Sequence, residues 1–116
     1  MELEVGMYVR TQKGNICKLL GYNEKEKVWI YMIEKEWFIL YETFVKKTSH
    51  NIIDLIEVGD YVNGYPVYEI IEYEDNTRAI VIGDDNESII WEESSQYIKT
   101  IVTKEAFESM SYKVGE

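Results

Sequence analysis

Six residues, EVGMYV at positions 4–9, return as EVGDYV at positions 57–62, with Met7 replaced by Asp60. Valine and tyrosine favour β-strands, and a glycine inside such a run often marks a β-bulge, in which one extra residue changes the face that the next side chains occupy. A chain of 116 residues has room for one ordinary domain or two very small ones. The phrase is therefore interpreted as the start of a strand, written once for each of two similar units.

The change from Met7 to Asp60 bears on whether the strand contains a β-bulge. Without a bulge, Val58, Asp60 and Val62 would share one face of a strand, which would leave a carboxylate on the apolar side. With a bulge at the glycine, we expect Asp60 to point to water while Val58 and Tyr61 pack inward. The change from Met7 to Asp60 is then expected to mark an exposed position at which the units are free to differ.

The similarity continues beyond the phrase when residue 57 is laid over residue 4. In each half an apolar strand runs into a tyrosine, Tyr22 or Tyr73, which is followed by a charged turn, NEKEK or EDNTR, and by a second apolar strand. The segment EWFILYETFVKKTS then parallels ESIIWEESSQYIKTIVT. Corresponding pieces in the same order indicate an internal duplication of about 53 residues per unit.

The pattern within each unit is that of short strands. Residues 28–33 and 79–82 are rich in β-branched and aromatic side chains and are bounded by polar turns. Asn63-Gly64 favours a tight hairpin turn, because glycine and, to a lesser degree, asparagine tolerate positive φ. Sheet packing is the expected role of the three tryptophans, Trp29, Trp37 and Trp91.

Turn signals about every ten residues are typical of small antiparallel sheets or barrels. We therefore expect a mainly β protein made of two similar, small, antiparallel SH3-like units, residues 1–56 and residues 57–116. Neither unit is large enough for a generous core, so we expect the two to pack as one compact body. Apolar residues at the junction are expected to lie near the shared seam: Ile52, Ile53, Leu55 and Ile56.

One segment, TKEAFESMSY at positions 103–112, has helical character. Thr103 is a suitable N-cap, and an acidic residue in the first turn complements the helix dipole. We predict a short C-terminal helix from Lys104 to Met110. Within this helix, Phe107 and Met110 are three positions apart and are expected to pack against the sheet. After the helix, Tyr112 and Val114 are expected to form a short edge strand.

The net charge of −10 is carried by the second half of the chain. Residues 1–56 hold eight acidic and eight basic side chains, whereas residues 57–116 hold fourteen acidic and four basic ones. Direct binding to nucleic acid requires a basic surface, and the second half lacks one. An acidic surface repels phosphate and anionic lipid, and it attracts basic proteins or cations.

Three further features limit the class of protein. No apolar run approaches the roughly 20 residues of a membrane span. The N-terminal MELEVGMYVR lacks the basic and apolar regions of a signal peptide. The single cysteine, Cys17, excludes an internal disulfide framework and suits a reducing compartment. We therefore expect a soluble, cytoplasmic protein with no membrane partner.

Few residues suited to catalysis or metal binding are present. Cys17 lies in an apolar strand, where a buried thiol is inert, and the only imidazole, His50, lies in a polar segment. One cysteine and one histidine cannot form a tetrahedral zinc site, and the glycines are isolated in turns instead of forming a phosphate loop. The run DDNES at positions 84–88 lacks the residue order of a calcium loop. We therefore expect no catalytic residue, no bound metal and no cofactor.

Carboxylates gather at the turns of the second unit. The first unit's turn NEKEK mixes both signs of charge, whereas EDNTR and GDDNES carry no lysine. Three interpretations are a solvated rim that keeps sheet edges from pairing, a surface for a basic partner, and a carboxylate metal or catalytic site. The contrast between the units favours the partner surface, since solubility alone does not require it. The candidate partner-binding residues are Glu72, Glu74, Asp75, Asp84, Asp85, Glu87, Glu92 and Glu93.

Two segments, SHNIIDLIEVGDYVNG at 49–64 and IKTIVTKEAFESMSYKVGE at 98–116, resemble segments of small, acidic, uncharacterised proteins encoded by phages and prophages of Gram-positive bacteria. The resemblance covers the junction and the C-terminus, and it carries no catalytic residue. It implies a context in which small acidic proteins, anti-CRISPR proteins among them, bind and disable host defence machinery.

The leading hypothesis is thus a non-enzymatic inhibitor. Its partner would be a basic, nucleic-acid-handling host protein, such as a CRISPR-associated nuclease, bound through carboxylates that imitate the field of phosphates. Two alternatives remain open. One is a structural or assembly module that self-associates through an apolar sheet edge, and the other is a carboxylate-based metal-binding protein or hydrolase.

Overall fold

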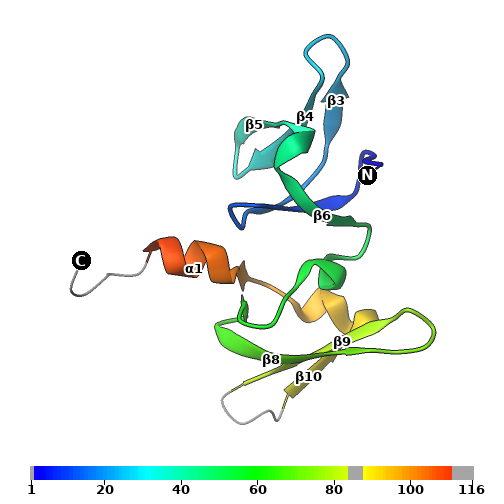
Figure 1. The fold of residues 1–116 in the computed structure, drawn as a ribbon, viewed down its shortest axis with the longest axis vertical. Helices are drawn as coiled ribbons and strands as arrows, with labels where there is room; N and C mark the ends of the chain where they lie inside the picture. Colours follow the sequence, from blue (N-terminus) through cyan, green and yellow to red (C-terminus); the bar gives the residue numbers. More distant parts are fainter. Residues whose placement is uncertain (1, 84–87, 111–116) are drawn as a thin grey trace. The chain divides into compact units, whose positions relative to one another are not determined.

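The structure of the chain is a computed structural model that describes residues 2–83 and 88–110. It is mainly β, with three small antiparallel sheets and one short C-terminal helix (Figure 1). The chain divides into two compact units, Met1–Leu55 and Ile56–Glu116. Five residues named above lie outside the described residues: Asp84, Asp85, Glu87, Tyr112 and Val114.

The first unit contains two three-stranded sheets and two short 3₁₀ helices. One sheet has the order β2-β1-β6, with β1 at Tyr8–Thr11, β2 at Ile16–Lys18 and β6 at Val45–Ser49. The other has the order β3-β4-β5, with β3 at Gly21–Asn23, β4 at Val28–Ile33 and β5 at Glu36–Leu40. The 3₁₀ helices are η1 at Glu42–Phe44 and η2 at Ile52–Leu55.

The core of the first unit joins its two sheets. Its buried members are Val9, Cys17, Leu19, Leu40 and Val45, and Leu3, Trp29 and Tyr31 pack against them. Burial of such apolar side chains is the main term that holds a unit of this size together. The expectation of a buried Cys17 is confirmed, and burial raises the pKa of its thiol to about 11.

The second unit contains one five-stranded sheet of order β10-β9-β8-β7-β11. Its strands are β7 at Tyr61–Val62, β8 at Tyr65–Glu72, β9 at Arg78–Ile82, β10 at Ser88–Trp91 and β11 at Ile101–Val102. A 3₁₀ segment, η3, spans Glu92–Tyr97, and the helix α1 spans Lys104–Met110. The interior strand β9 is buried along Ala79–Ile82, which explains its unbroken apolar run.

The predicted hairpin turn at Asn63-Gly64 is confirmed. Asn63 has φ 54° and Gly64 has φ 85°, and the two residues connect β7 directly to β8. The Asn63 side chain has a further role, because its Oδ1 accepts hydrogen bonds from the backbone N–H groups of Lys99, at 2.7 Å, and Thr100, at 3.1 Å. This turn therefore also anchors the segment that leads into β11.

The two copies of the repeated phrase adopt the same local structure. Gly6 and Gly59 have φ of 96° and 99°, and each follows a residue with an exposed side chain, Val5 or Val58. The N–H of Gly6 donates to the Leu19 carbonyl, and the Leu19 N–H donates to the Met7 carbonyl, both at 2.8 Å. Two residues therefore lie opposite one, which defines a β-bulge with glycine in its first position.

The second copy repeats this bond pattern around Val67. Gly59 donates to the Val67 carbonyl at 3.1 Å, and the Val67 N–H donates to the Asp60 carbonyl at 2.8 Å. The bulge predicted from the glycine is thus present in both copies. A turn precedes it in each case, since the N–H groups of Met7 and Asp60 donate to the carbonyls of Glu4 and Glu57.

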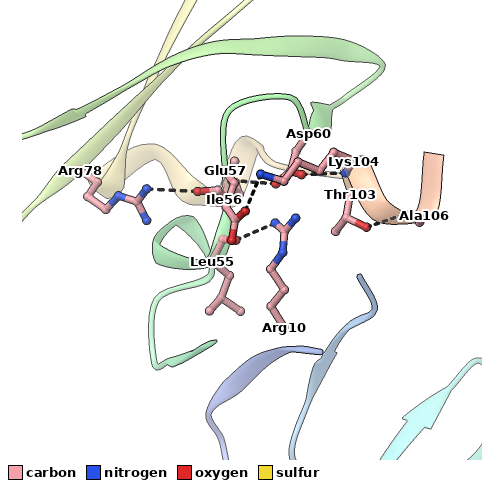
Figure 2. Close-up of polar contacts among 9 residues, drawn as sticks. All are labelled: Arg10, Leu55, Ile56, Glu57, Asp60, Arg78, Thr103, Lys104 and Ala106. Atoms are coloured by element: carbon pink, nitrogen blue, oxygen red, sulfur yellow. Dashed lines mark hydrogen bonds and ion pairs between the residues drawn. The ribbon is translucent and has the colours of Figure 1, made fainter. Parts of the chain in front are cut away.

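The expected directions of Asp60 and of Val58 are both wrong. Its side chain is fully buried, whereas Val58 is 51% exposed. The Asp60 carboxylate accepts the Glu57 N–H at 2.7 Å through Oδ2 and the Lys104 N–H at 2.9 Å through Oδ1 (Figure 2). Two charge-assisted hydrogen bonds compensate the loss of hydration, and this explains how a carboxylate can lie on the buried side. Tyr61 packs inward as expected, with its ring stacked on that of Phe107 at 5.0 Å.

The helix prediction is confirmed in its bounds and in its cap. Thr103 Oγ1 accepts the Ala106 N–H at 3.2 Å, and its carbonyl accepts the Phe107 N–H at 2.8 Å. Lys104 Nζ lies 2.8 Å from Glu57 Oε1, which adds a second contact between the first turn of α1 and the repeated phrase (Figure 2). The packing expected of Met110 is wrong, because this side chain is 73% exposed.

The tryptophans do not share one environment. Trp29 packs against the core of the first unit as expected, but Trp37 is 63% exposed and Trp91 is 42% exposed. Among the four junction residues, Ile53, Leu55 and Ile56 are fully buried and Ile52 is half-buried. No helix in the described part of the chain is long and apolar enough to cross a membrane.

Candidate functional site

The described candidate carboxylates lie at one end of the β8-β9-β10 part of the sheet. Strand pairing aligns Ile71 of β8, Ala79 of β9 and Trp91 of β10 across the three strands. Glu72, the last residue of β8, pairs with Arg78, the first residue of β9. Glu92 and Glu93 follow Trp91 directly and begin η3, so they leave the sheet at this same end.

The turn between β8 and β9 carries the next two carboxylates, Glu74 and Asp75. The turn is closed by two backbone hydrogen bonds of 3.0 Å, from Tyr73 N–H to the Thr77 carbonyl and from Asn76 N–H to the Tyr73 carbonyl. Asp75 Oδ1 accepts the Thr77 hydroxyl at 2.6 Å and the Thr77 N–H at 3.1 Å. These bonds favour the charged form and lower the pKa of Asp75. Asp75 therefore shapes the turn as well as contributing charge.

An aromatic pair lies among these carboxylates. The rings of Tyr73 and Trp91 are stacked, with centroids 5.7 Å apart and an interplanar angle of 23°. Tyr73 is 38% exposed and Trp91 is 42% exposed, so part of each ring remains open to water. Exposed aromatic rings beside charged groups are typical of the residues that dominate protein interfaces.

The basic residue that begins β9 at this end of the strands, Arg78, is directed into the unit. Only 12% of its side chain is exposed, and its Nη2 donates to the Ile56 carbonyl at 3.1 Å (Figure 2). Its Nε lies 3.8 Å from Glu72 Oε1, but the Glu72 side chain is 74% exposed. An ion pair so open to solvent neutralises little of the surface charge. The carboxylates here consequently present a surface of one sign.

These residues form a set that we call the acidic-aromatic patch, defined as Glu72, Tyr73, Glu74, Asp75, Trp91, Glu92 and Glu93. Its four exposed carboxylates are Glu72, Glu74, Asp75 and Glu93, whereas Glu92 is half-buried. The structure thus brings together five of the eight predicted residues. Asp84, Asp85 and Glu87 lie outside the described residues.

Sequence reasoning missed the aromatic part of the patch. Sheet packing is the role expected of Trp91, and Tyr73 lies 18 positions before it in the chain, so the sequence does not pair the two rings. Each does, however, lie next to a carboxylate at the end of an apolar strand, beside Glu72 and Glu92. That position, at the boundary of the buried sheet, is the signal that could have indicated partial exposure.

The groups considered for catalysis are separated. Cys17 lies in the core of the first unit, while the His50 side chain is 57% exposed and its Nε2 lies 2.6 Å from Glu4 Oε1. Within residues 2–83 and 88–110, no three histidine, cysteine, aspartate or glutamate side chains gather closely enough to hold a metal ion.

Comparison of the chain with protein-family models, with curated proteins and with solved structures found no match in any of the three.

Proposed function

We propose that the protein is a non-enzymatic inhibitor that binds the basic, nucleic-acid-binding surface of a host defence protein through the acidic-aromatic patch. The observation that carries this proposal is the exposed Tyr73–Trp91 stack surrounded by carboxylates, with the neighbouring Arg78 turned inward. A purely solubilising rim would not need open aromatic rings at its centre, because exposed rings lower solubility.

The two parts of the patch have complementary roles in this proposal. The carboxylates provide a negative field that accelerates the encounter with a basic surface and imitates a row of phosphates. The aromatic faces receive the guanidinium or ammonium groups that would otherwise contact nucleic acid, each contributing about 0.5–2 kcal/mol depending on how far it is desolvated. The partner class is therefore a protein whose arginines and lysines line a groove for nucleic acid.

The resemblance of residues 49–64 and 98–116 to small phage and prophage proteins supports a host defence protein, such as a CRISPR-associated nuclease, as the target. Its site of action would be the bacterial cytoplasm, where such nucleases work. No cofactor is required, because binding alone blocks the groove.

We also propose that the two units arose by internal duplication of an SH3-like ancestor. The shared bulges at Gly6 and Gly59, with the same pattern of hydrogen bonds, support this origin. In this scheme the units diverged at Asp60, where the second unit gained the anchor for α1, and at the turn 73–77, where it lost the lysines of the first. The second unit would then be the specialised one.

The test is a comparison of two triple variants with the same change in net charge. The first, Glu72→Lys/Glu74→Lys/Glu93→Lys, reverses the patch; the second, Glu24→Lys/Glu26→Lys/Glu34→Lys, reverses exposed carboxylates of the first unit. Surface plasmon resonance against a panel of bacterial CRISPR-associated nucleases would measure affinity, with competition by the nuclease's own guide or target strand.

We expect the patch variant to bind at least about tenfold more weakly, a loss of about 1.4 kcal/mol, and the control to bind like the wild type. Affinity should also fall as added salt shortens the Debye length from about 10 Å towards 3 Å. Equal losses of affinity in the two variants would mean that net charge, and not the acidic-aromatic patch, determines binding, and would refute the proposed site. Simultaneous binding of the protein and nucleic acid to one nuclease would refute occupation of the groove.

A further inference from the structure

The first unit presents an apolar sheet face that the acidic-aromatic patch does not involve. Pairing of β4 with β5 sets Ile30 opposite Ile39 and Met32 opposite Trp37, so these four side chains share one face. The opposite face, with Trp29 and Tyr31, packs on the core. The outer face remains open: Trp37 is 63% exposed, Ile39 58% and Met32 37%, and Ile30 lines a shallow pocket with Trp37 and Ile39.

Strand β5 also forms an edge of its sheet. Within the described part of the chain, it pairs with β4 and with no other strand. Edge strands are ordinarily protected from pairing by proline, lysine, a bulge or a charged side chain that points inward. The strand EWFIL has none of these between its first and last residues, and no register shift interrupts its pairing with β4.

The direction of the free backbone groups follows from one hydrogen bond. The Ile30 carbonyl accepts the Leu20 N–H at 2.8 Å, so Ile30 directs its polar backbone groups away from β5. Its partner Ile39 therefore belongs to a non-hydrogen-bonded pair, and so does Trp37, two residues away. In such pairs the N–H and C=O groups point outward. Trp37 and Ile39 thus direct both their backbone groups and their apolar side chains to the open edge and outer face.

We propose that β5 pairs with β5 of a second copy of this chain, antiparallel, about a two-fold axis at Phe38. This register places Trp37 of one copy opposite Ile39 of the other, and the outward backbone groups of both residues then form four hydrogen bonds across the axis. The same register stacks Trp37 on Ile39 of the other copy twice, which closes the apolar face into one continuous strip. The result is a six-stranded sheet shared by two copies.

Charge favours a second copy at this edge over a basic or acidic partner. The first unit holds eight acidic and eight basic residues, so its approach to a copy of itself meets no net repulsion, whereas the second unit carries the whole net charge of −10. In the proposed register the only charged residue of β5, Glu36, lies opposite Leu40 and not opposite another carboxylate. The pairing is thus compatible with a two-fold axis along the whole strand.

This proposal does not depend on the proposed function, because it uses a different unit and an uncharged face. Sedimentation equilibrium of the wild-type chain should give a monomer–dimer equilibrium whose larger species has twice the 13.7 kDa chain mass. Its dissociation constant should not rise with added salt, because salt screens the repulsion between two chains of net charge −10. A wild-type chain that remains monomeric throughout the concentration range that sedimentation can reach would overturn the proposal.

A matched pair of variants locates the interface. Ile39→Lys places a charge on the β5 edge. Ile89→Lys places the same charge on β10, an edge strand of the five-stranded sheet of the second unit, where Ile89 is 45% exposed. We expect Ile39→Lys to weaken the dimer at least about tenfold and Ile89→Lys to leave it unchanged. Trp37→Lys provides a second variant if Ile39→Lys loses its circular-dichroism spectrum. A dimer that tolerates both β5 variants, or that responds equally to Ile89→Lys, contradicts the β5 interface.

The register is tested by crosslinking at the axis. Phe38→Cys would place two thiols across the two-fold axis within the separation that a disulfide spans, whereas Ile89→Cys would not. The native Cys17 is buried and its pKa is raised, so it should not compete. Mild oxidation should give a covalent dimer of Phe38→Cys alone. Equal crosslinking of both variants would indicate random collision and would refute the register.

Discussion

Replacing Asp60 by alanine removes a buried acceptor that joins the backbone of the first turn of α1 to the repeated phrase. In the wild type, the Asp60 carboxylate accepts the backbone N–H groups of Glu57, at 2.7 Å, and of Lys104, at 2.9 Å. The side chain is fully buried, so water does not replace these bonds without rearrangement of the chain around it. The variant therefore leaves two donors to be satisfied in another way.

The magnitude follows from the number and kind of bonds. A hydrogen bond to a charged group contributes roughly 1.5–3 kcal/mol, and a buried donor left without a partner costs about 1–3 kcal/mol. Two such donors, with partial relaxation of the helix terminus, give an expected loss of about 2–4 kcal/mol in the free energy of unfolding of the second unit. For a unit of this size, each kcal/mol lowers Tm by roughly 4–8 °C, so the shift should exceed about 8 °C.

Urea unfolding followed by far-ultraviolet circular dichroism measures this loss directly. Glu74→Ala is the matched control, since it deletes a carboxylate from an exposed turn of the same unit. We expect its transition to lie close to that of the wild type. A loss for Asp60→Ala no larger than that of the control would refute the assignment of Asp60 as a buried anchor.

Asp60→Asn keeps the size of the side chain but changes the number of hydrogen bonds that it can accept. Asparagine has nearly the same shape, but it offers one acceptor oxygen, so its amide nitrogen must face the N–H of either Glu57 or Lys104. We expect this variant to lose at least half as much stability as Asp60→Ala. A wild-type transition for Asp60→Asn would mean that the two hydrogen bonds do not stabilise the fold as inferred.

Two further predictions concern the bulge glycines and the buried thiol. Gly6→Ala and Gly59→Ala should each cost about 1–2 kcal/mol of unfolding free energy, because alanine is strained at their positive φ. Gly21→Ala should cost much less, because Gly21 has no positive φ and a Cβ there meets open space. Equal costs for the three variants in a urea titration would contradict the bulge geometry. Cys17 should react slowly with iodoacetamide near pH 8 and faster only as the pH approaches 11, and rapid alkylation of the native chain at pH 8 would show that the thiol is not buried. Because folding raises the pKa of this thiol, the unfolded state loses the proton first, so the free energy of unfolding should fall as the pH rises above 9.

The two proposals assign separate roles to the two units. The second unit would recognise a basic partner through charge and exposed aromatic rings, and the first would join two copies through a neutral, apolar strand edge. A dimer would then present two acidic-aromatic patches at once. If both patches reached one target, the second contact would be intramolecular, and binding would be tighter than that of one patch. Ile39→Lys would reveal this coupling by lowering apparent affinity without altering the patch.

Much of the fold was predictable because its signals are local. The turn at Asn63-Gly64 depends on two residues that tolerate positive φ, and the bulges depend on one glycine each. The helix α1 begins where Thr103 can cap it and ends where it was predicted to end. Each of these features is decided by interactions among residues a few positions apart, which the order of amino acids records directly.

The candidate surface was predictable in charge but not in form. The excess of carboxylates in residues 57–116 is a property of composition. Glu72 and Glu93 belong to one patch because pairing aligns the three strands β8, β9 and β10. Tyr73 stacks on Trp91 because the end of β8 and the end of β10 lie at the same end of the sheet. Arg78 could have neutralised the patch; its inward direction follows from a hydrogen bond to a carbonyl elsewhere in the unit.

The sequence by itself determined that this protein is mainly β, that its strands turn where glycine and asparagine allow it, and that one half is acidic. Tertiary structure alone decided which side chains are covered. Asp60 is buried against a donor from a distant segment, the Lys104 N–H, which lies 44 residues away in the chain. Trp37 is exposed because its face of the sheet packs on no other element in the described part of the chain. Burial depends on partners brought together from distant parts of the chain, and neither periodicity nor composition specifies those partners.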